Sequence, residues 1–356
     1  MGDARIPPPQ PRDAIRAMHP YEWEPPSANI ARQAGVPEDQ VVRFDTNTFP
    51  WPGVALEDLP PLGLNEYPDT SYGALTQAIA DYNDVAMDRI TVGAGADEIL
   101  DLCAKAYIDP STTVVMARPT YPMFRILTEI AGGPIDEVPM IDLRLDRAAF
   151  IARARNARLT WLCNPNNPTG ELLPLEFVAD VAKATRGVLV VDEAYFEMSG
   201  VTALPLIESM PNVVISRTFS KAFGLAGARV GYALAGPTIS DALRRVRPPG
   251  SISVVSEALG AKSMRDLDGM RKRVAAIKTE RERLRADLTG LGLEVRESAA
   301  NFLLVHAGRK AAPALLRSGL VVRTFGATHP LADYIRVTVR KPEENRRLVE
   351  GLAALA

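Results

Sequence analysis

A lysine lies among hydroxyl and glycine residues in the segment SRTFSKAFGLAGARVGY, residues 216–232. This lysine, Lys221, follows a predicted buried strand, and Arg229 comes shortly after it in the same segment. A lysine held in such partly dry surroundings loses its proton more readily and becomes an amine nucleophile. A single lysine is more often a solvated surface residue, so the motifs around it must decide its role.

Three further motifs place polar groups where apolar segments end. VVDEAYFE ends a predicted strand at Asp192, where an ionised carboxylate needs a cation such as a protonated pyridine nitrogen, unless it only caps the next helix. NPNNPTG, residues 164–170, predicts a tight turn that presents amide side chains. GAGADEIL, residues 93–100, leads small residues into a helix whose first backbone N–H groups could hold a phosphate, although it lacks the third glycine of a dinucleotide fingerprint.

Alternating helical and apolar segments from about Tyr72 onward predict the element that positions these motifs. Helical stretches such as GALTQAIADYND are interleaved with the apolar runs TVVMA, LTWLC, GVLVV, NVVIS and VGYALA. Apolar, β-branched runs between helices are typical of parallel strands buried on both faces. Several of these runs are followed by polar residues, namely Asn164, Asp192 and Ser216. The carboxyl ends of parallel strands share one edge, so we expect a ligand site there.

The two ends of the chain differ from this middle part. After about residue 262 comes a long charged helical segment, SMRDLDGMRKRVAAIKTERERLRADL, followed by LEVRES, NFLLVH, LVVRTF and YIRVTV. This order predicts a smaller α+β domain. Frequent prolines in the first thirty residues predict an extended arm of the kind that often crosses a partner subunit. We therefore predict an arm over residues 1–30, a large cofactor-binding domain over 31–255 and a small C-terminal domain over 256–356.

The composition points to small molecules as partners. The 356 residues include 41 basic and 43 acidic side chains, so no overall field indicates a nucleic acid or a membrane surface. The two cysteines, Cys103 and Cys163, lie in apolar runs and suit a reducing compartment. The first residues lack the apolar core of a signal peptide, and no apolar run is long enough to span a bilayer. We expect a cytoplasmic protein without a metal site.

Seven motifs in order carry a resemblance to a known family. They are LNEYPDTSYGAL, GAGADEIL, RPTYPMF, NPNNPTG, VVDEAYFE, RTFSKAFGLAGARVGY and YIRVTV. From about Tyr21 to the C terminus the chain resembles the aspartate-aminotransferase-like, fold-type I pyridoxal-phosphate enzymes, and among them the histidinol-phosphate aminotransferases. This resemblance implies a large domain with a mostly parallel central sheet flanked by helices, plus a smaller α+β domain. It also implies transfer of an amino group from histidinol phosphate to 2-oxoglutarate, a step of histidine biosynthesis.

The resemblance also implies which residues hold pyridoxal 5′-phosphate. Lys221 would bind it as a Schiff base and shuttle a proton, and Asp192 would keep its pyridine nitrogen protonated. Asn167 and Tyr195 would hydrogen-bond its phenolic oxygen, and Tyr121 would stack on its ring. The groups implied for its phosphate are Ala96, Asp97, Thr218, Ser220, Arg229 and, from the neighbouring subunit of a homodimer with shared sites, Tyr67.

Four residues are implied for the substrate. Arg336 in YIRVTV matches the arginine that grips the substrate α-carboxylate through its planar fork. Arg323 and Tyr21 lie where the family binds the substrate phosphate, and Asn47 lies in a nearby motif. The plainer alternatives are that Tyr21 only anchors the arm and that Arg323 is a solvated strand residue.

Departures from the family pattern keep other donors open. Thr48 stands where the family usually carries an acidic residue, and Ser251 and Arg340 also lie in segments that differ from it. These segments border the predicted substrate pocket. An aromatic or other amino acid therefore remains an alternative donor, and a pyridoxal-phosphate decarboxylase or lyase of the same fold remains a further alternative.

Overall fold

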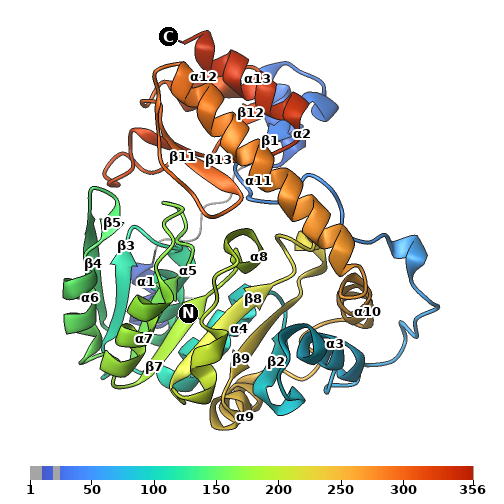
Figure 1. Ribbon diagram of the computed structural model, residues 1–356, viewed down its shortest axis with the longest axis vertical. Helices are drawn as coiled ribbons and strands as arrows, with labels where there is room; N and C mark the ends of the chain where they lie inside the picture. The colour runs from blue at the N-terminus through green and yellow to red at the C-terminus, as the bar shows by residue number, and fades with distance from the viewer. Residues whose placement is uncertain (1–9, 19–24, 356) are drawn as a thin grey trace, which may run out of the picture.

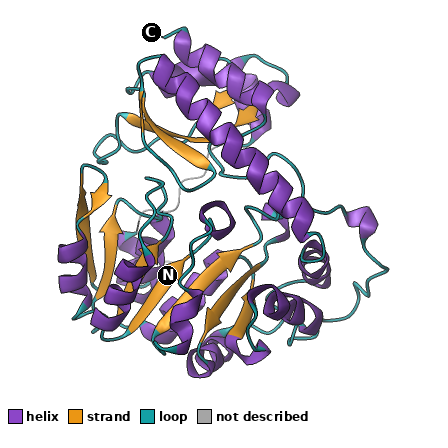
Figure 2. Ribbon diagram, viewed as in Figure 1, coloured by secondary structure: helices purple, strands orange, loops and turns teal. Residues whose placement is uncertain are grey.

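The computed structural model describes residues 10–18 and 25–355 (Figure 1). Its largest element is an eight-stranded sheet with the strand order β2-β9-β8-β7-β6-β3-β4-β5. Helices cover both faces of this sheet (Figure 2), as the predicted α/β class requires. The strands are β2 (Ile90–Gly93), β3 (Val114–Arg118), β4 (Ile135–Ile141), β5 (Arg144–Leu145), β6 (Leu159–Cys163), β7 (Val188–Asp192), β8 (Val213–Thr218) and β9 (Gly231–Ala235).

The centre of the sheet is parallel, and every residue of β6, β7 and β8 is buried. Cys163 pairs with Asp192, and Asp192 pairs with Ser216, so the polar strand ends meet at one edge as predicted. The prediction was wrong for VGYALA, because β9 runs antiparallel to both β8 and β2. No crossover helix follows β8, and the chain simply turns back through the Lys221 loop, which only an antiparallel strand permits.

Side-chain alternation along the strands divides the apolar core into two layers. Val114, Trp161 and Val190 pack on one face with helix residues such as Phe124, whereas Leu162 packs on the other. The helices that follow or precede these strands are α3 (Gly73–Asn83), α4 (Ala96–Tyr107), α5 (Pro122–Ala131), α6 (Arg147–Ala154), α7 (Leu175–Ala184), α8 (Phe196–Ser199) and α9 (Pro237–Val246). Short 3-10 turns are η1 (Glu38–Gln40), η2 (Leu56–Asp58), η3 (Met87–Arg89), η4 (Leu204–Glu208) and η5 (Ala226–Ala228).

The C-terminal part forms the expected smaller α+β unit around an antiparallel sheet of order β10-β11-β13. The predicted long helix begins at Leu267 rather than at Ser263, because Ser263 ends α10 and the Asp266 carboxylate accepts a hydrogen bond from the Gly269 N–H. The elements are α10 (Val254–Ser263), α11 (Leu267–Gly290), β10 (Glu294–Val295), β11 (Phe302–His306), α12 (Ala311–Leu316), β12 (Leu320–Val321), β13 (Tyr334–Thr338) and α13 (Pro342–Ala353).

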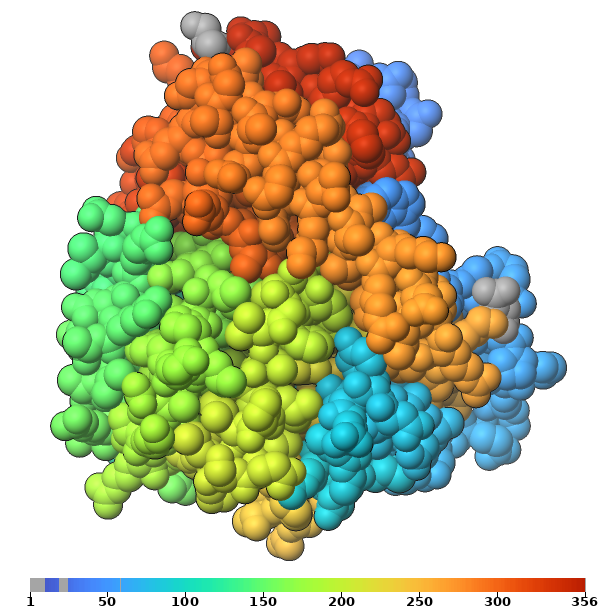
Figure 3. Space-filling view, in the orientation of Figure 1, coloured from blue at the N-terminus to red at the C-terminus, as the bar shows by residue number. Residues whose placement is uncertain are grey.

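The described N-terminal residues contain α1 (Asp13–Ala17), α2 (Ser27–Ala34) and β1 (Val42–Arg43). Strand β1 pairs in parallel with β12, far along the chain, and in Figure 3 this blue segment lies against the red C-terminal residues. The segment after the predicted arm thus packs on the C-terminal unit, while the domain boundaries at residues 30 and 255 stay predictions. Among the helices of the described residues, none combines the length and apolar character needed to cross a bilayer.

Gly187 lies just before β7, the strand that carries Asp192, and lets the backbone there approach the residue before β6 closely. A Cβ atom at this position would lie 1.8 Å from the backbone oxygen of Arg158. We expect Gly187→Ala to lower the free energy of unfolding by about 1–3 kcal/mol, measured by urea denaturation. The control is Gly290→Ala in α11, where a Cβ meets nothing within 4 Å. Equal stability of the two variants would contradict this close approach.

Candidate active site

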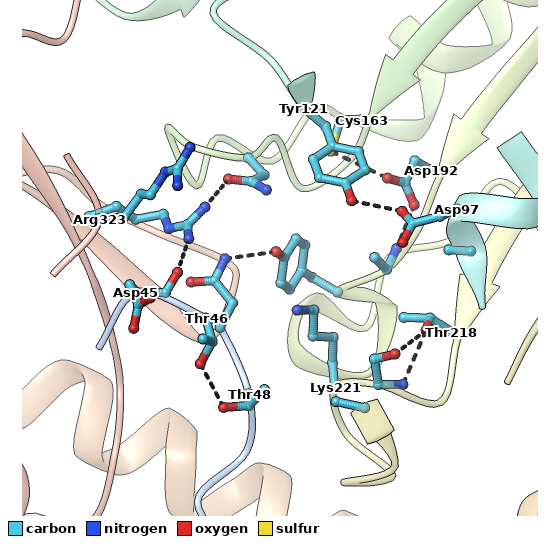
Figure 4. Close-up of a pocket in the computed structure, with 18 of the residues that line it drawn as sticks. Asp45, Thr46, Thr48, Asp97, Tyr121, Cys163, Asp192, Thr218, Lys221 and Arg323 are labelled. Atoms are coloured by element: carbon cyan, nitrogen blue, oxygen red, sulfur yellow. Dashed lines mark hydrogen bonds between the residues drawn. The ribbon is translucent and has the colours of Figure 1, made fainter. Parts of the chain in front are cut away.

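A cavity of about 470 Å³ lies at the carboxyl edge of β6, β7 and β8 (Figure 4). It is also lined by residues of the C-terminal unit and of the segment after β1. Apart from Tyr67 and Tyr21, the cavity brings together the predicted site residues, namely Lys221, Asp192, Tyr195, Asn167, Tyr121, Ala96, Asp97, Thr218, Ser220, Arg229, Arg336, Arg323 and Asn47. Tyr67 is 96% exposed and does not line it, and Tyr21 lies outside the described residues. The individual roles of these residues stay predictions.

Asp192 is a buried carboxyl group at the end of β7. Burial raises its pKa to about 7, and the Ala194 N–H, which donates to Oδ1 over 3.2 Å, opposes part of this shift. The charge of Asp97 raises the pKa further, whereas Lys221 lowers it. The Cys163 thiol lies 3.9 Å from Oδ2, and burial raises the pKa of that thiol well above its ordinary value. This carboxyl group is therefore poised to bind a cation.

Lys221 projects into the cavity from the loop between β8 and β9 (Figure 4). Its Nζ lies 5.7 Å from the centre of the Tyr195 ring. Desolvation and, to a smaller extent, the positive charge of Arg336 lower the pKa of this amine to about 8, against the opposing charges of Asp97 and Asp192. The unprotonated fraction of this amine near neutral pH is thus much larger than that of an ordinary lysine, so Lys221 can act as a nucleophile and accept a proton.

An anion site lies at the start of α4. Gly95 has a φ of +83°, and a Cβ on it would lie 2.7 Å from Arg229 Nη2, so glycine lets the arginine reach this helix end. Thr218 Oγ1 lies 3.0 Å from Ser220 Oγ and accepts a hydrogen bond from the Ser220 N–H. The Asp97 carboxylate pairs with Arg229 at 3.0 Å, so only its backbone N–H suits an anion. The N–H groups at the start of this helix, the two hydroxyls and the guanidinium could together hold a phosphate.

The opposite end of the cavity is cationic. Arg323 and Arg336 face each other through two backbone hydrogen bonds of 3.1 and 2.9 Å. Arg336 also donates to Asn167 Oδ1 over 2.7 Å and to the Asp45 backbone oxygen over 2.5 Å. Asn47 donates to the Tyr195 hydroxyl over 3.0 Å, which links this end to the centre of the site.

Sequence reasoning missed several lining residues. Arg43 binds the buried Asp45 carboxylate through two hydrogen bonds of 2.8 and 2.6 Å, and Thr46 also lines the cavity, next to Thr48, whose segment was already predicted to border the substrate pocket. Their position depends on the pairing of β1 with β12, for which the sequence carries no local signal. Cys163 also lines the cavity, and its place directly before Asn164 at a strand end could have identified it. Within the described residues, no three His, Cys, Asp or Glu side chains gather as a metal site needs.

The sequence model of the family described as aminotransferase class I and II matches residues 56–352. The chain belongs to this family. The aminotransferase is 39% identical to a histidinol-phosphate aminotransferase of Thermococcus gammatolerans over 322 residues, covering 88% of this chain and 92% of that protein. It is 35% identical to one of Symbiobacterium thermophilum over 358 residues, covering 96% and 98%.

Solved structures agree on the fold-type I architecture. The histidinol-phosphate aminotransferase from Sinorhizobium meliloti in complex with pyridoxal-5′-phosphate matches this aminotransferase with a TM-score of 0.86 at 28% identity, covering 100% and 99% of the two chains. L-threonine-O-3-phosphate decarboxylase from Porphyromonas gingivalis matches with a TM-score of 0.74 at 20% identity, covering 88% and 99%. At that identity only the fold is shared, so the reaction must be argued from the site.

The lowered pKa of Lys221 predicts its reactivity in the aminotransferase without a bound ligand. Trace labelling with acetic anhydride, followed by peptide mass spectrometry, should give half-maximal reaction of Lys221 near pH 8, because only the neutral amine reacts. N-acetyl-lysine serves as the reference amine. In Arg336→Gln the midpoint should move to higher pH, since a neighbouring positive charge is lost. A midpoint near that of the reference amine in both proteins would contradict the desolvated site.

Proposed function

We propose that this aminotransferase uses pyridoxal 5′-phosphate to transfer the amino group of histidinol phosphate to 2-oxoglutarate. The observation that supports the proposal is a single cavity that contains a lysine of lowered pKa, groups suited to an anion at the start of α4, and two arginines, Arg323 and Arg336, at its opposite end. The family and the similarity to histidinol-phosphate aminotransferases support it. Two separate anion sites suit a cofactor phosphate together with a phosphorylated donor.

The described residues fit the cofactor in charge and chemistry. The Lys221 amine suits an aldehyde, and the buried Asp192 carboxyl suits a ring nitrogen that carries a proton. The start of α4, with Ser220 and Arg229, suits the phosphate. When bound, pyridoxal phosphate draws electrons away from the bond that breaks at the substrate carbon.

The side chains of the protein orient the substrate and transfer a proton to and from the substrate carbon at which the bond breaks. Lys221, with a pKa of about 8, can take a proton from the substrate carbon and return it near neutral pH. Tyr195 and Asn167 offer a hydroxyl and an amide to the same space, and both are held by neighbours, Asn47 and Arg336 respectively. These bonds fix the orientation of the polar groups before a substrate enters, which lowers the entropic cost of the reaction.

The cationic end must serve two different substrates in turn. Histidinol phosphate has a phosphate and no α-carboxylate, whereas glutamate and 2-oxoglutarate have carboxylates. We assign the donor phosphate mainly to Arg323, and we assign Arg336 to the carboxylate in one half-reaction and to the phosphate in the other. Planar guanidinium groups suit both anions because they bind two oxygens at once.

Substitution of the two arginines separates these tasks. Arg323→Ala should raise the KM for histidinol phosphate about 10- to 100-fold and change that for 2-oxoglutarate little, since a charge-assisted hydrogen bond is worth roughly 1.5–3 kcal/mol. Arg336→Ala should raise both. Glutamate formation from 2-oxoglutarate is the assay, with phenylalanine, tyrosine and leucine as competing donors, and exposed Arg309→Ala is the control. A wild-type preference for phenylalanine or tyrosine would refute the donor and leave the aminotransferase activity standing.

We also propose that the active form is a homodimer in which Tyr67 reaches the cofactor phosphate of the partner subunit. Leu56, Leu64 and Tyr67 are 61%, 73% and 96% exposed on one stretch of chain, and apolar groups gathered in this way suit a covered surface. A cytoplasmic location fits the two unpaired, buried cysteines.

Hybrid dimers test the shared site. Lys221→Ala and Tyr67→Phe subunits should each assemble into impaired dimers, whereas a hybrid contains one site with both native residues. After verified subunit exchange in an equimolar mixture, activity should rise toward about one quarter of the wild-type value. No recovery would count against the contribution of Tyr67 to the partner's site and would leave the donor assignment untouched.

A further inference from the structure

A buried ion pair lies directly behind the cavity, between the ends of β7 and β8. Arg217 donates to Glu193 Oε2 through Nε at 3.0 Å and Nη2 at 2.8 Å, and both side chains are 2% exposed. Glu193 immediately follows Asp192, and Arg217 immediately precedes Thr218. Neighbouring side chains of a strand point to opposite faces, so this pair lies on the far side of the sheet from the cavity.

The pair holds the segment that carries Tyr195. The Arg217 guanidinium lies 3.6 Å from the centre of the Phe196 ring, one residue after Tyr195. Glu193 Oε1 accepts a hydrogen bond of 2.6 Å from the Ala203 N–H, so the same pair also ties down the far end of this segment. Glu193 and Phe196 thus fix the backbone on either side of Tyr195.

Arg217 joins this segment to the rest of the large unit. It donates to Asn83 Oδ1 on α3 over 2.7 Å and to Thr202 Oγ1 over 2.7 Å. The Glu193 N–H donates to the Ser216 backbone oxygen over 2.8 Å, so the two strand ends are connected through backbone and side chains alike. A shift of Arg217 would therefore move both strand ends, that of β7 at Asp192 and that of β8 at Thr218.

The pair also balances charge beneath the cavity. The negative charge of Glu193 acts on Asp192, which Asp97 and Lys221 face from the cavity side. Arg217 is faced by Glu193 and by two further groups, Glu197 and Tyr232. Loss of Arg217 leaves the Glu193 carboxylate without its ion-pair partner, and loss of Glu193 removes one of the negative charges that face Arg217, so either loss changes the charge close to Asp192 in a region of low dielectric constant.

We propose that Glu193 and Arg217 are a positioning pair of the cofactor site, which aligns Asp192 and Tyr195 and keeps the charge beneath them balanced. The proposal rests on the cofactor assignment made above. It gives the pair a task in the reaction in addition to its contribution to stability, although neither side chain lines the cavity.

The test uses the holoenzyme and two variants that each remove one charge, the isosteric Glu193→Gln and Arg217→Met, which keeps an unbranched apolar side chain without the guanidinium group. The readout is the pH midpoint at which the visible absorption of bound pyridoxal phosphate changes. Loss of Arg217 leaves extra negative charge beneath the cavity, which favours the protonated form of the bound cofactor and should raise the pH midpoint. Loss of the Glu193 carboxylate removes negative charge and should lower the midpoint. We expect shifts of about half to one pH unit, since charges at this range still interact appreciably. The groups around Lys221 itself, namely Arg336, Asp97, Asp192 and Arg229, stay unchanged.

The double variant Glu193→Gln/Arg217→Met separates alignment from charge. The pH midpoint of the double variant should return to within about 0.3 pH unit of the wild-type value, because both charges are gone. Its kcat should nevertheless be at least about 10-fold below that of the wild type, with a far smaller change in KM, because the alignment of Asp192 and Tyr195 is still lost. Glu208→Gln, which removes an exposed partner of Arg89, is the control and should leave both quantities unchanged. If the single variants fold poorly, the double variant still decides the point, since wild-type kcat in it overturns the proposal.

Two failures are distinguishable. A wild-type protein that takes up no pyridoxal phosphate refutes the cofactor assignment and this inference with it. A normal wild-type holoenzyme with single-variant midpoints that shift in the same direction, or do not shift, refutes the positioning pair alone, because a purely structural role has no reason to depend on the sign of the lost charge.

Discussion

Burial of Asp192 at the end of a parallel strand is the constraint around which the site is organised. A carboxylate in this place costs free energy unless a cation meets it, and among the described residues it contacts the Cys163 thiol and the Ala194 N–H but forms no ion pair. The nearby Lys221 amine is itself disfavoured as a cation. The cavity thus suits a bound group of the proposed kind, with positive charge beside Asp192 and an electrophile beside Lys221.

The sheet explains how residues from distant motifs meet. In-register parallel pairing brings Cys163, Asp192 and Ser216 side by side, and the antiparallel return of β9 places the Lys221 loop against the start of α4. The C-terminal unit then adds Arg323 and Arg336 from above the same edge. The residues proposed for the cofactor and those proposed for the substrate therefore lie largely on different elements, which is consistent with one fold that serves several reactions.

The sequence predicts the strand-end half of the site well and the substrate half less well. Motifs such as VVDEAYFE and NPNNPTG couple a buried strand to a polar end, so local pattern and function coincide there. Strand β9 is antiparallel because the short connection from β8 contains no crossover helix, and an apolar run alone does not show in which direction a strand runs. Arg43 and Asp45 reach the cavity only through tertiary pairing of β1 with β12, and the ion pair of Glu193 with Arg217 depends on strand order.

The pairing of β1 with β12 has a consequence for synthesis on the ribosome. Val42 and Leu320 lie far apart in the sequence, so the sheet that seats the segment from Arg43 to Thr48 cannot close until Val321 has emerged from the ribosome. The strand-end half of the cavity has all its residues much earlier. A nascent chain could thus assemble the strand-end half of the cavity first and add the half that contains Arg43, Arg323 and Arg336 only after the C-terminal unit has been synthesised.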